Sequence, residues 1–230
     1  MARYLALIKV FLACACLVPL ALLVIRAFGL AGMSLGANPV EEILNVCGKT
    51  GLNLLMLTLC VTPIRRSTGL NRLVALRRML GLFSFFYLVL HFLTYALLDL
   101  HLDWDTLLVD IGKRPYITVG FTAIVLMIPL AATSTNRMQR WLGRRWGRLH
   151  RLVYPIAILA VVHYWWQTKL DVSDPLLYAF LLGALFLARI LHWRDMRRKR
   201  AKARSINSKA TMAPTYERVE PPQPRQEASR

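Results

Sequence analysis

The chain has 230 residues, of which 56% are hydrophobic and 18% are charged, and its formal net charge is +18. A soluble domain averages about 45–50% apolar and about 25% charged residues, so this composition excludes a typical soluble domain and indicates a membrane protein. Six membrane-spanning helices of about 20 residues would use roughly 120 residues, which excludes a large catalytic domain outside the bilayer.

Six apolar runs follow one another along the chain and predict an all-α bundle of six membrane-spanning helices. The runs cover about residues 4–25, 46–64, 79–98, 115–133, 152–168 and 175–193. The first run resembles a secretory signal peptide, but five further runs follow it, so we expect it to remain as a span. Prolines inside three of the runs predict local bends, at Pro19, Pro129 and Pro155.

The charged residues between the runs predict the orientation of the bundle. The connection 65–78 carries five arginines and no acid, the connection 137–151 carries six arginines and no acid, and residues 194–204 carry seven basic side chains. The alternate connections hold most of the acids, namely Glu41, Glu42, Asp99, Asp103, Asp105, Asp110, Asp171 and Asp174. Because basic connections stay in the cytoplasm, both termini are expected on the cytoplasmic side. This distribution also favours membrane topology over nucleic-acid binding.

The chain is expected to divide into a transmembrane domain, residues 1–204, and a polar, proline-rich tail, residues 205–230. The tail has almost nothing to bury, so a disordered cytoplasmic segment is predicted. No internal repeat, GxGxxG motif, phosphate-binding loop or CxxC pair is present, which disfavours nucleotide and zinc-thiolate sites. The apolar runs also contain no Asp or Glu, which disfavours a proton-coupled transporter.

Two histidines inside the apolar runs are candidate ligands of a cofactor. His91 lies about 20 Å along its run from Arg78, and His163 about 18 Å along its run from Arg151, at about 1.5 Å per residue. Both runs cross from the inner to the outer side, so the two imidazoles are expected at nearly equal depth. Two imidazoles at one level can provide both axial ligands of a haem iron. The alternative is that each histidine bonds a neighbouring helix.

The other three histidines are weaker candidates. His150 lies at the cytoplasmic boundary, and on an ideal helix it points about 140° away from His163, so the two share a face only if Pro155 distorts the helix. His101, among acids of an outer connection, could belong to a metal site, but a solvated, partner-facing loop explains it better. His192 is expected to anchor the inner end of the last run. Tyr87 and Tyr95 share a helix face with His91 and could line a cofactor pocket.

Two segments carry a specific resemblance to a known family. The segments RRMLGLFSFFYLVLHFLTY and WGRLHRLVYPIAILAVVHYWW, within the six-span layout, resemble the ferric-reductase-like transmembrane family over about residues 1–200. The resemblance is strongest to the branch that provides the haem-binding membrane subunit of a bacterial periplasmic methionine sulfoxide reductase system.

The resemblance implies which residues bind haem. In the wider family, two histidines on the third span pair with two on the fifth and hold an inner and an outer haem b. In this sequence the outer pair would be His91 and His163, as axial ligands of the haem iron. The inner position is present on the fifth span as His150, but the third span carries Arg77 and Arg78 there. The resemblance therefore implies a complete outer site and an incomplete inner one.

The resemblance also implies a role in the bacterial inner membrane. Members of this branch take electrons from the membrane quinone pool and pass them through haem b to MsrP, a periplasmic molybdenum-containing catalytic subunit that repairs oxidised proteins. FMN is associated with the family, although no site for it can be placed here. The chain is therefore expected to be an electron-transfer subunit that is not catalytic alone. The alternatives are a stand-alone metal or quinone reductase and a non-redox membrane transporter.

Overall fold

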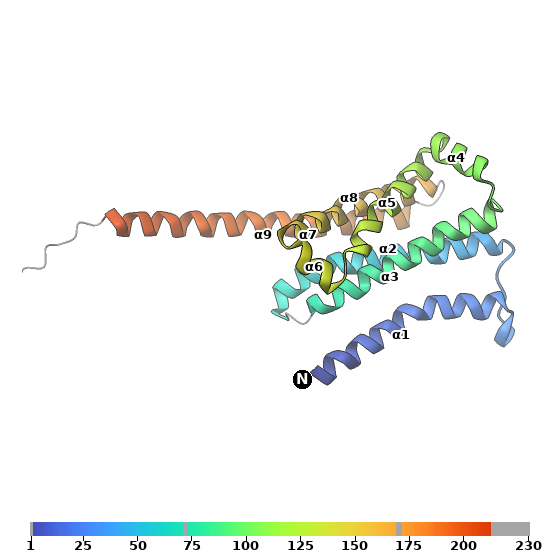
Figure 1. Cartoon of the computed structure of the whole chain (residues 1–230), viewed down its shortest axis with the longest axis horizontal. Helices are drawn as coiled ribbons and strands as arrows, with labels where there is room; N and C mark the ends of the chain where they lie inside the picture. Colours follow the sequence, from blue (N-terminus) through green and yellow to red (C-terminus); the bar gives the residue numbers. More distant parts are fainter. Residues whose placement is uncertain (1, 71–72, 169–171, 213–230) are drawn as a thin grey trace, which may run out of the picture. The chain divides into compact units, whose positions relative to one another are not determined.

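The computed structural model describes residues 2–70, 73–168 and 172–212, and every regular element within them is a helix (Figure 1). The chain divides into two units, residues 1–188 and 189–230, and the site described below lies within the first. The α-helices are α1 (Ala2–Ala27), α2 (Pro39–Thr68), α3 (Val74–Thr94), α4 (Trp104–Lys113), α5 (Pro115–Ala132), α6 (Asn136–Leu142), α7 (Arg144–Leu149), α8 (Val153–Gln167) and α9 (Ser173–Met212). Three short elements are η1 (Leu30–Gly32), the π-helix η3 (Tyr95–Asp99) and the 3-10 helix η4 (His150–Leu152).

Within the part of the chain that the structure describes, five helical segments are long and apolar enough to cross a bilayer, so the chain is a multi-pass membrane protein. They are Ala6–Ala27, Pro39–Thr68, Val74–Asp99, Pro115–Ala132 and Ser173–Ser205. These segments correspond to five of the six apolar runs. The remaining run corresponds to α8, whose 15 residues are fewer than the about 20 that a straight crossing needs.

The helix boundaries differ from the expected ones where capping residues or helix-forming residues extend an apolar run. The helix α2 begins at Pro39, because the Asn38 side chain accepts a hydrogen bond from the Glu41 amide at 3.3 Å and proline suits the first helical position. The helix α9 runs to Met212, so residues 205–212 are helical where a disordered tail is expected. Alanine, lysine and arginine, which favour helices, fill positions 201–204 and extend α9. Residues 213–230 of the predicted tail, and Asp171, lie outside the described residues.

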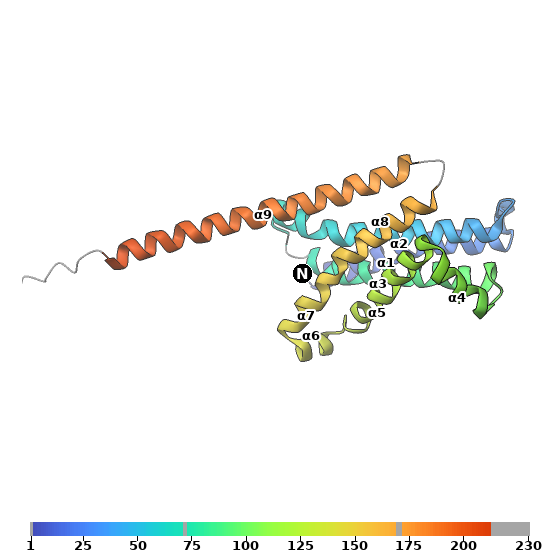
Figure 2. The ribbon, with the colours of Figure 1, turned by 90° about the horizontal axis from the view of Figure 1, so that it is seen from above.

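Two pairs of helices pack closely and bring the two membrane histidines together. Figures 1 and 2 show α2 beside α3 and α5 beside α8. In the first pair, the buried Ser84 hydroxyl donates to the Gly51 carbonyl at 2.8 Å. A side chain at Gly51 would place its Cβ 2.8 Å from Leu88, so glycine is needed for this close approach. The core shared with the second pair includes Leu59 and Ile156, both fully buried.

The helix α1 is attached to α3 through the side chain of Tyr87. Tyr87 is fully buried, and its hydroxyl donates to the Cys16 carbonyl at 2.7 Å and accepts from the Leu20 amide at 3.2 Å. The hydroxyl therefore lies between the Leu20 amide and the Cys16 carbonyl, which would bond each other directly in a regular helix. Pro19 lies next to this position. An inserted side chain and a proline both bend helices, and α1 bends in its middle (Figure 1). The expectation that Tyr87 lines a cofactor pocket is wrong, because its hydroxyl bonds α1.

We expect Tyr87→Phe to lower the free energy of unfolding by about 1–3 kcal/mol, because the partly buried Leu20 amide and the buried Cys16 carbonyl of α1 lose their shared partner. Denaturant titration in detergent, followed by circular dichroism, measures the change. The matched control is Tyr178→Phe, which removes an exposed hydrogen bond of 2.6 Å to Asn53 and should have a smaller effect. Equal stability of the two variants would show that the Tyr87 hydroxyl is not important for the packing of α1.

Candidate functional site

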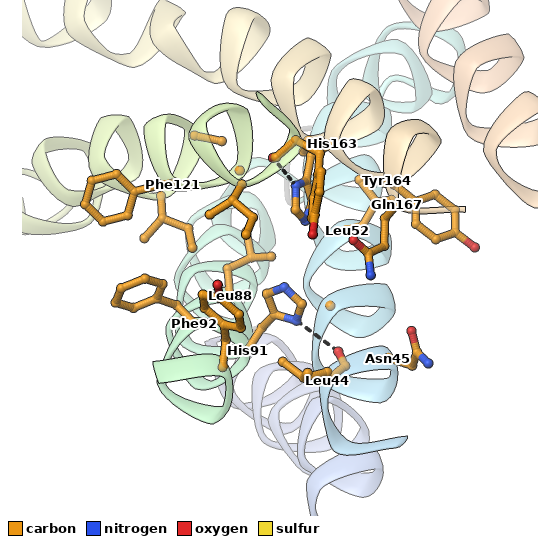
Figure 3. A pocket seen from close by; sticks show the side chains of 18 of the residues that line it. Leu44, Asn45, Leu52, Leu88, His91, Phe92, Phe121, His163, Tyr164 and Gln167 are labelled. Atoms are coloured by element: carbon orange, nitrogen blue, oxygen red, sulfur yellow. Dashed lines mark hydrogen bonds between the residues drawn. The ribbon is translucent and has the colours of Figure 1, made fainter. Parts of the chain in front are cut away.

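A cavity of about 250 Å³ opens between α2, α3, α5 and α8, and His91 and His163 both line it. The two imidazole rings lie across from each other (Figure 3), with ring centres 6.2 Å apart and planes inclined by 81°. The expectation that these two histidines share one depth therefore agrees with the geometry. Most of the surrounding wall is apolar and includes Leu52, Leu88, Phe92 and Phe121.

Each of these imidazoles is held by a backbone carbonyl of the neighbouring helix. Nδ1 of His91 lies 2.9 Å from the Leu44 carbonyl oxygen, and Nδ1 of His163 lies 2.7 Å from the Tyr116 carbonyl oxygen (Figure 3). A carbonyl oxygen can only accept, so Nδ1 is the donor in both rings. The lone pair of a neutral ring is then on Nε2. A carbonyl bonded to the outer nitrogen is the usual support of a histidine that binds a metal.

The spacing of the two rings suits a single metal between them. A bond from a metal to an imidazole nitrogen is about 2.0 Å, so two opposed imidazoles on one metal have ring centres a little over 6 Å apart. The observed 6.2 Å agrees with this value. Within the described residues, no group of three or more His, Cys, Asp or Glu side chains could hold a bare metal ion. The pair therefore fits a metal that brings its own equatorial ligands, as the iron of a haem does.

Two cations also line the cavity, and each is paired with an acid. Lys49 donates to Asp174 at 2.8 Å, and Arg114 pairs with Asp110 at 3.0 Å. Both cations are about half exposed, whereas Asp110 is buried and also accepts a hydrogen bond of 2.6 Å from Tyr95. Lys49 is not among the residues predicted from the sequence, although a lysine within an apolar run is itself a signal of a functional position.

His150 lies outside this cavity. It forms part of η4, its ring stacks on Trp146 with centres 4.0 Å apart, and its Nδ1 lies 3.2 Å from the Trp146 carbonyl oxygen. Its Nε2 is buried and makes no hydrogen bond within the part of the chain that the structure describes. On α3, Arg78 donates to the Asn136 side chain at 2.6 Å. The structure thus brings together His91 and His163 but places His150 separately.

Tyr95, predicted to share a pocket face with His91, lines the cavity, whereas His101, Asp103 and His192 do not. His101 and Leu102 have positive φ angles, 47° and 61°, in the turn that leads into α4. Asp103 caps α4, because its carboxylate accepts from the Asp105 and Thr106 amides and from the Thr106 hydroxyl. These hydrogen bonds, led by that from the Thr106 hydroxyl, lower the pKa of Asp103. His192 lies on α9, partly exposed.

Comparisons with known proteins show which family the chain is similar to. Residues 47–161, which include His91 and His150, match the model of the "Ferric reductase like transmembrane component" family. The heme-binding subunit MsrQ of the protein-methionine-sulfoxide reductase of Xanthomonas campestris pv. campestris (strain B100) is 49% identical over 171 residues, covering 74% of this chain and 78% of that protein. The MsrQ of Ralstonia nicotianae (strain ATCC BAA-1114 / GMI1000) is 52% identical over 166 residues, covering 70% of this chain and 76% of that protein.

Proposed function

The chain belongs to the ferric-reductase-like transmembrane family and, within it, to the MsrQ heme-binding subunits, and we propose that it carries electrons across the membrane to a periplasmic methionine sulfoxide reductase. Membership of this family makes the chain a haem-binding membrane subunit of a methionine sulfoxide reductase system. The proposal rests mainly on the geometry of His91 and His163. Nδ1 of each ring is bonded to a backbone carbonyl, and the two ring centres lie 6.2 Å apart.

His91 and His163 are the proposed axial ligands of a haem b. A haem held by these two imidazoles would supply one-electron chemistry, because its iron can be ferric or ferrous. The Leu44 and Tyr116 carbonyls fix the orientation of the two rings. The mostly apolar wall lowers the dielectric around the two rings, which tunes the potential of a redox centre.

The two cations of the cavity suit the acidic substituents of a haem. Arg114 and Lys49 line the cavity, and a propionate can pair with either cation by a charge-assisted hydrogen bond. Arg114 can bind a carboxylate with two parallel bonds, whereas Lys49 acts as a point charge. We assign both side chains to the support of the proposed haem.

His150 is proposed as a second cofactor-binding residue, at the inner end of the bundle. Its buried Nε2 is available as a ligand atom within the described structure, and Trp146 fixes the ring by stacking. Arg78, on α3, is already bonded to Asn136. The inner position therefore offers one imidazole, in contrast to the opposed pair of the outer position.

We propose six crossings with both termini in the cytoplasm of a bacterial inner membrane. The helices α7, η4 and α8 follow one another without a break from Arg144 to Gln167, which corresponds to roughly 36 Å at about 1.5 Å per residue. A continuous helical segment of this length is long enough for a hydrocarbon core of about 30 Å. The alternation of basic and acidic connections supports this orientation.

Reporter fusions at residues 66, 104, 145 and 204 should report a periplasmic position for residue 104 alone. The reason is that acids surround residue 104, whereas arginines surround the other three positions. Paired alkaline phosphatase and fluorescent protein fusions at each position make the measurement. A periplasmic signal at residue 145 would contradict the proposed crossing by α8 and the side of the membrane assigned to the haem.

The proposed donor is a quinol of the membrane pool, and the proposed acceptor is an MsrP-like catalytic subunit in the periplasm. The purified chain should show a Soret band that shifts when an anaerobic quinol solution is added, and the haem content per chain gives the occupancy. A preparation that binds no haem would overturn the proposal and leave a non-redox transporter as the alternative. Reoxidation by ferric chelates but not by the periplasmic subunit would instead favour a stand-alone metal reductase. The same preparation can be assayed for FMN, which the family resemblance implies.

We expect Asp105→Asn to slow electron delivery to the periplasmic partner at low salt and to have little effect at high salt. An acidic loop steers a partner with a basic patch, and this attraction is screened when the Debye length falls below about 10 Å. Asp105 is a better probe than Asp103, because Asp103 also caps α4. Stopped-flow reoxidation of the reduced haem at several salt concentrations gives the rates. An unchanged salt dependence would remove Asp105 from the docking surface and leave the electron-transfer function untouched.

A further inference from the structure

The two halves of the proposed haem site are built in the same way. In each half, a backbone carbonyl accepts from a histidine that follows it by 47 residues, Leu44 with His91 and Tyr116 with His163. One helical turn after each carbonyl, at the fourth residue, the helix carries a glycine, Gly48 on α2 and Gly120 on α5. Residues four apart lie on the same face of a helix, so each glycine lies beneath the ring that its carbonyl holds.

Both glycines lie so close to the imidazoles that a side chain would displace the rings. A Cβ atom at Gly48 would lie 3.0 Å from Nδ1 and 3.2 Å from Cε1 of His91. A Cβ atom at Gly120 would lie 2.6 Å from Nδ1 and 2.8 Å from Cε1 of His163. The contacted atoms include the nitrogen that donates to the carbonyl, so the bare glycine backbone is what lets each ring approach its acceptor.

We propose that Gly48 and Gly120 are positioning residues that set the orientation and donor strength of the two axial imidazoles, and through them the reduction potential of the haem. This inference rests on the proposed function. A hydrogen bond from Nδ1 to a carbonyl makes Nε2 a stronger electron donor, and a stronger donor favours the ferric state. A methyl group at either glycine weakens that bond and shifts the balance toward the ferrous state, which raises the midpoint potential.

The contacts at Gly120 are tighter than those at Gly48, so the two substitutions should have different effects. The bond of His163 is the shorter one, 2.7 Å against 2.9 Å, and the predicted clash at Gly120 is the more severe. Gly120→Ala should therefore weaken haem retention by about 10-fold or more, the usual scale for loss of a support behind a metal ligand. In Gly48→Ala a shift of a few tenths of an ångström relieves the contact, so this variant should keep its haem with a raised midpoint potential.

A redox titration of the haem-loaded full chain tests the proposal in three variants. Gly48→Ala and Gly120→Ala are compared with Gly81→Ala, a control on α3 where a Cβ would lie 3.8 Å from Thr58, an ordinary contact. Electron paramagnetic resonance of the ferric protein is the second measurement, because the low-spin signal depends on the angle between the ring planes, 81° in this structure. We expect a raised potential and an altered signal in Gly48→Ala, loss of most haem in Gly120→Ala, and wild-type behaviour in Gly81→Ala.

The outcomes separate this inference from the proposed function. Suppose that the wild-type protein contains low-spin haem and that Gly48→Ala keeps the wild-type midpoint potential and paramagnetic resonance signal. This result would leave the proposed function intact and overturn the positioning role of the glycines. A shift in the Gly81→Ala control as large as that in Gly48→Ala would also overturn it, because the effect would then be general packing. A wild-type protein without haem would overturn both. If Gly120→Ala does not accumulate, the comparison of Gly48→Ala with Gly81→Ala decides.

Discussion

His91→Ala and His163→Ala are each expected to lose most or all of the haem spectrum of the purified protein. Each substitution leaves the iron with one axial imidazole at the outer site, and the cavity is lined by no other histidine and by no cysteine within the described residues. Each also removes a ring that the Leu44 or Tyr116 carbonyl holds in place. The measurement is Soret absorbance per mole of folded protein, with a pyridine haemochrome assay as an independent count.

The other histidines provide the controls for this experiment. His101→Ala and His192→Ala should keep the wild-type spectrum, because neither residue lines the cavity. His150→Ala is expected to cause a partial loss, since its buried Nε2 is the proposed ligand atom of the inner position. A wild-type spectrum in His91→Ala together with haem loss in His101→Ala would show that the ligand assignment is wrong.

Much of the arrangement around the site could be predicted from hydropathy and charge. Five of the six apolar runs correspond to described helices that are long and apolar enough to cross the bilayer, because length and composition can be read directly from the sequence. Counting residues from Arg78 and Arg151 gives the shared depth of His91 and His163, because rise per residue is nearly constant in a helix. Both inferences use regular properties of helices and need no side-chain packing.

The supports of the two imidazoles could not be predicted in this way. The acceptors are the backbone carbonyls of Leu44 and Tyr116, and every residue has a carbonyl, so no residue type marks them. The geometric repeat of carbonyl, glycine and histidine became visible only when the helices were placed. Tyr87 illustrates the same difficulty. Helical periodicity predicts that it shares a face with His91, but it does not predict that α1 bends where the Tyr87 hydroxyl bonds its backbone.

The helix that carries His150 and His163 shows how a local distortion limits helical arithmetic. An ideal helix separates the two residues by about 140°, and that value assumes regular geometry throughout. The 3-10 turn His150–Leu152 interrupts the regular helix between them. A 3-10 turn changes both the rise and the rotation per residue. The stacking of His150 on Trp146 could therefore not be predicted from regular helix geometry.

The purified chain alone is expected to reduce no methionine sulfoxide, whereas addition of the periplasmic catalytic subunit and a reduced quinol should start turnover. The reason is structural: the described outer connections, residues 28–38 and 99–114, carry only η1 and the ten-residue helix α4 besides short turns. Such connections are too short to shape a pocket for an oxidised protein substrate. We therefore expect this chain to hold and orient the proposed haem and the chemistry on sulfur to occur in the proposed partner.

The experiment measures loss of methionine sulfoxide by mass spectrometry in four mixtures: the chain with quinol, the partner with quinol, both proteins with quinol, and both proteins with a reduced flavin donor. Only the mixtures that contain both proteins should be active, and the His163→Ala variant should abolish turnover with quinol because the proposed haem ligand is missing. Fast reduction of methionine sulfoxide by the chain and quinol alone would overturn the assignment as an electron-transfer subunit. Turnover by the partner and quinol without the chain would show that this membrane subunit is dispensable, since the quinol would then deliver its electrons directly.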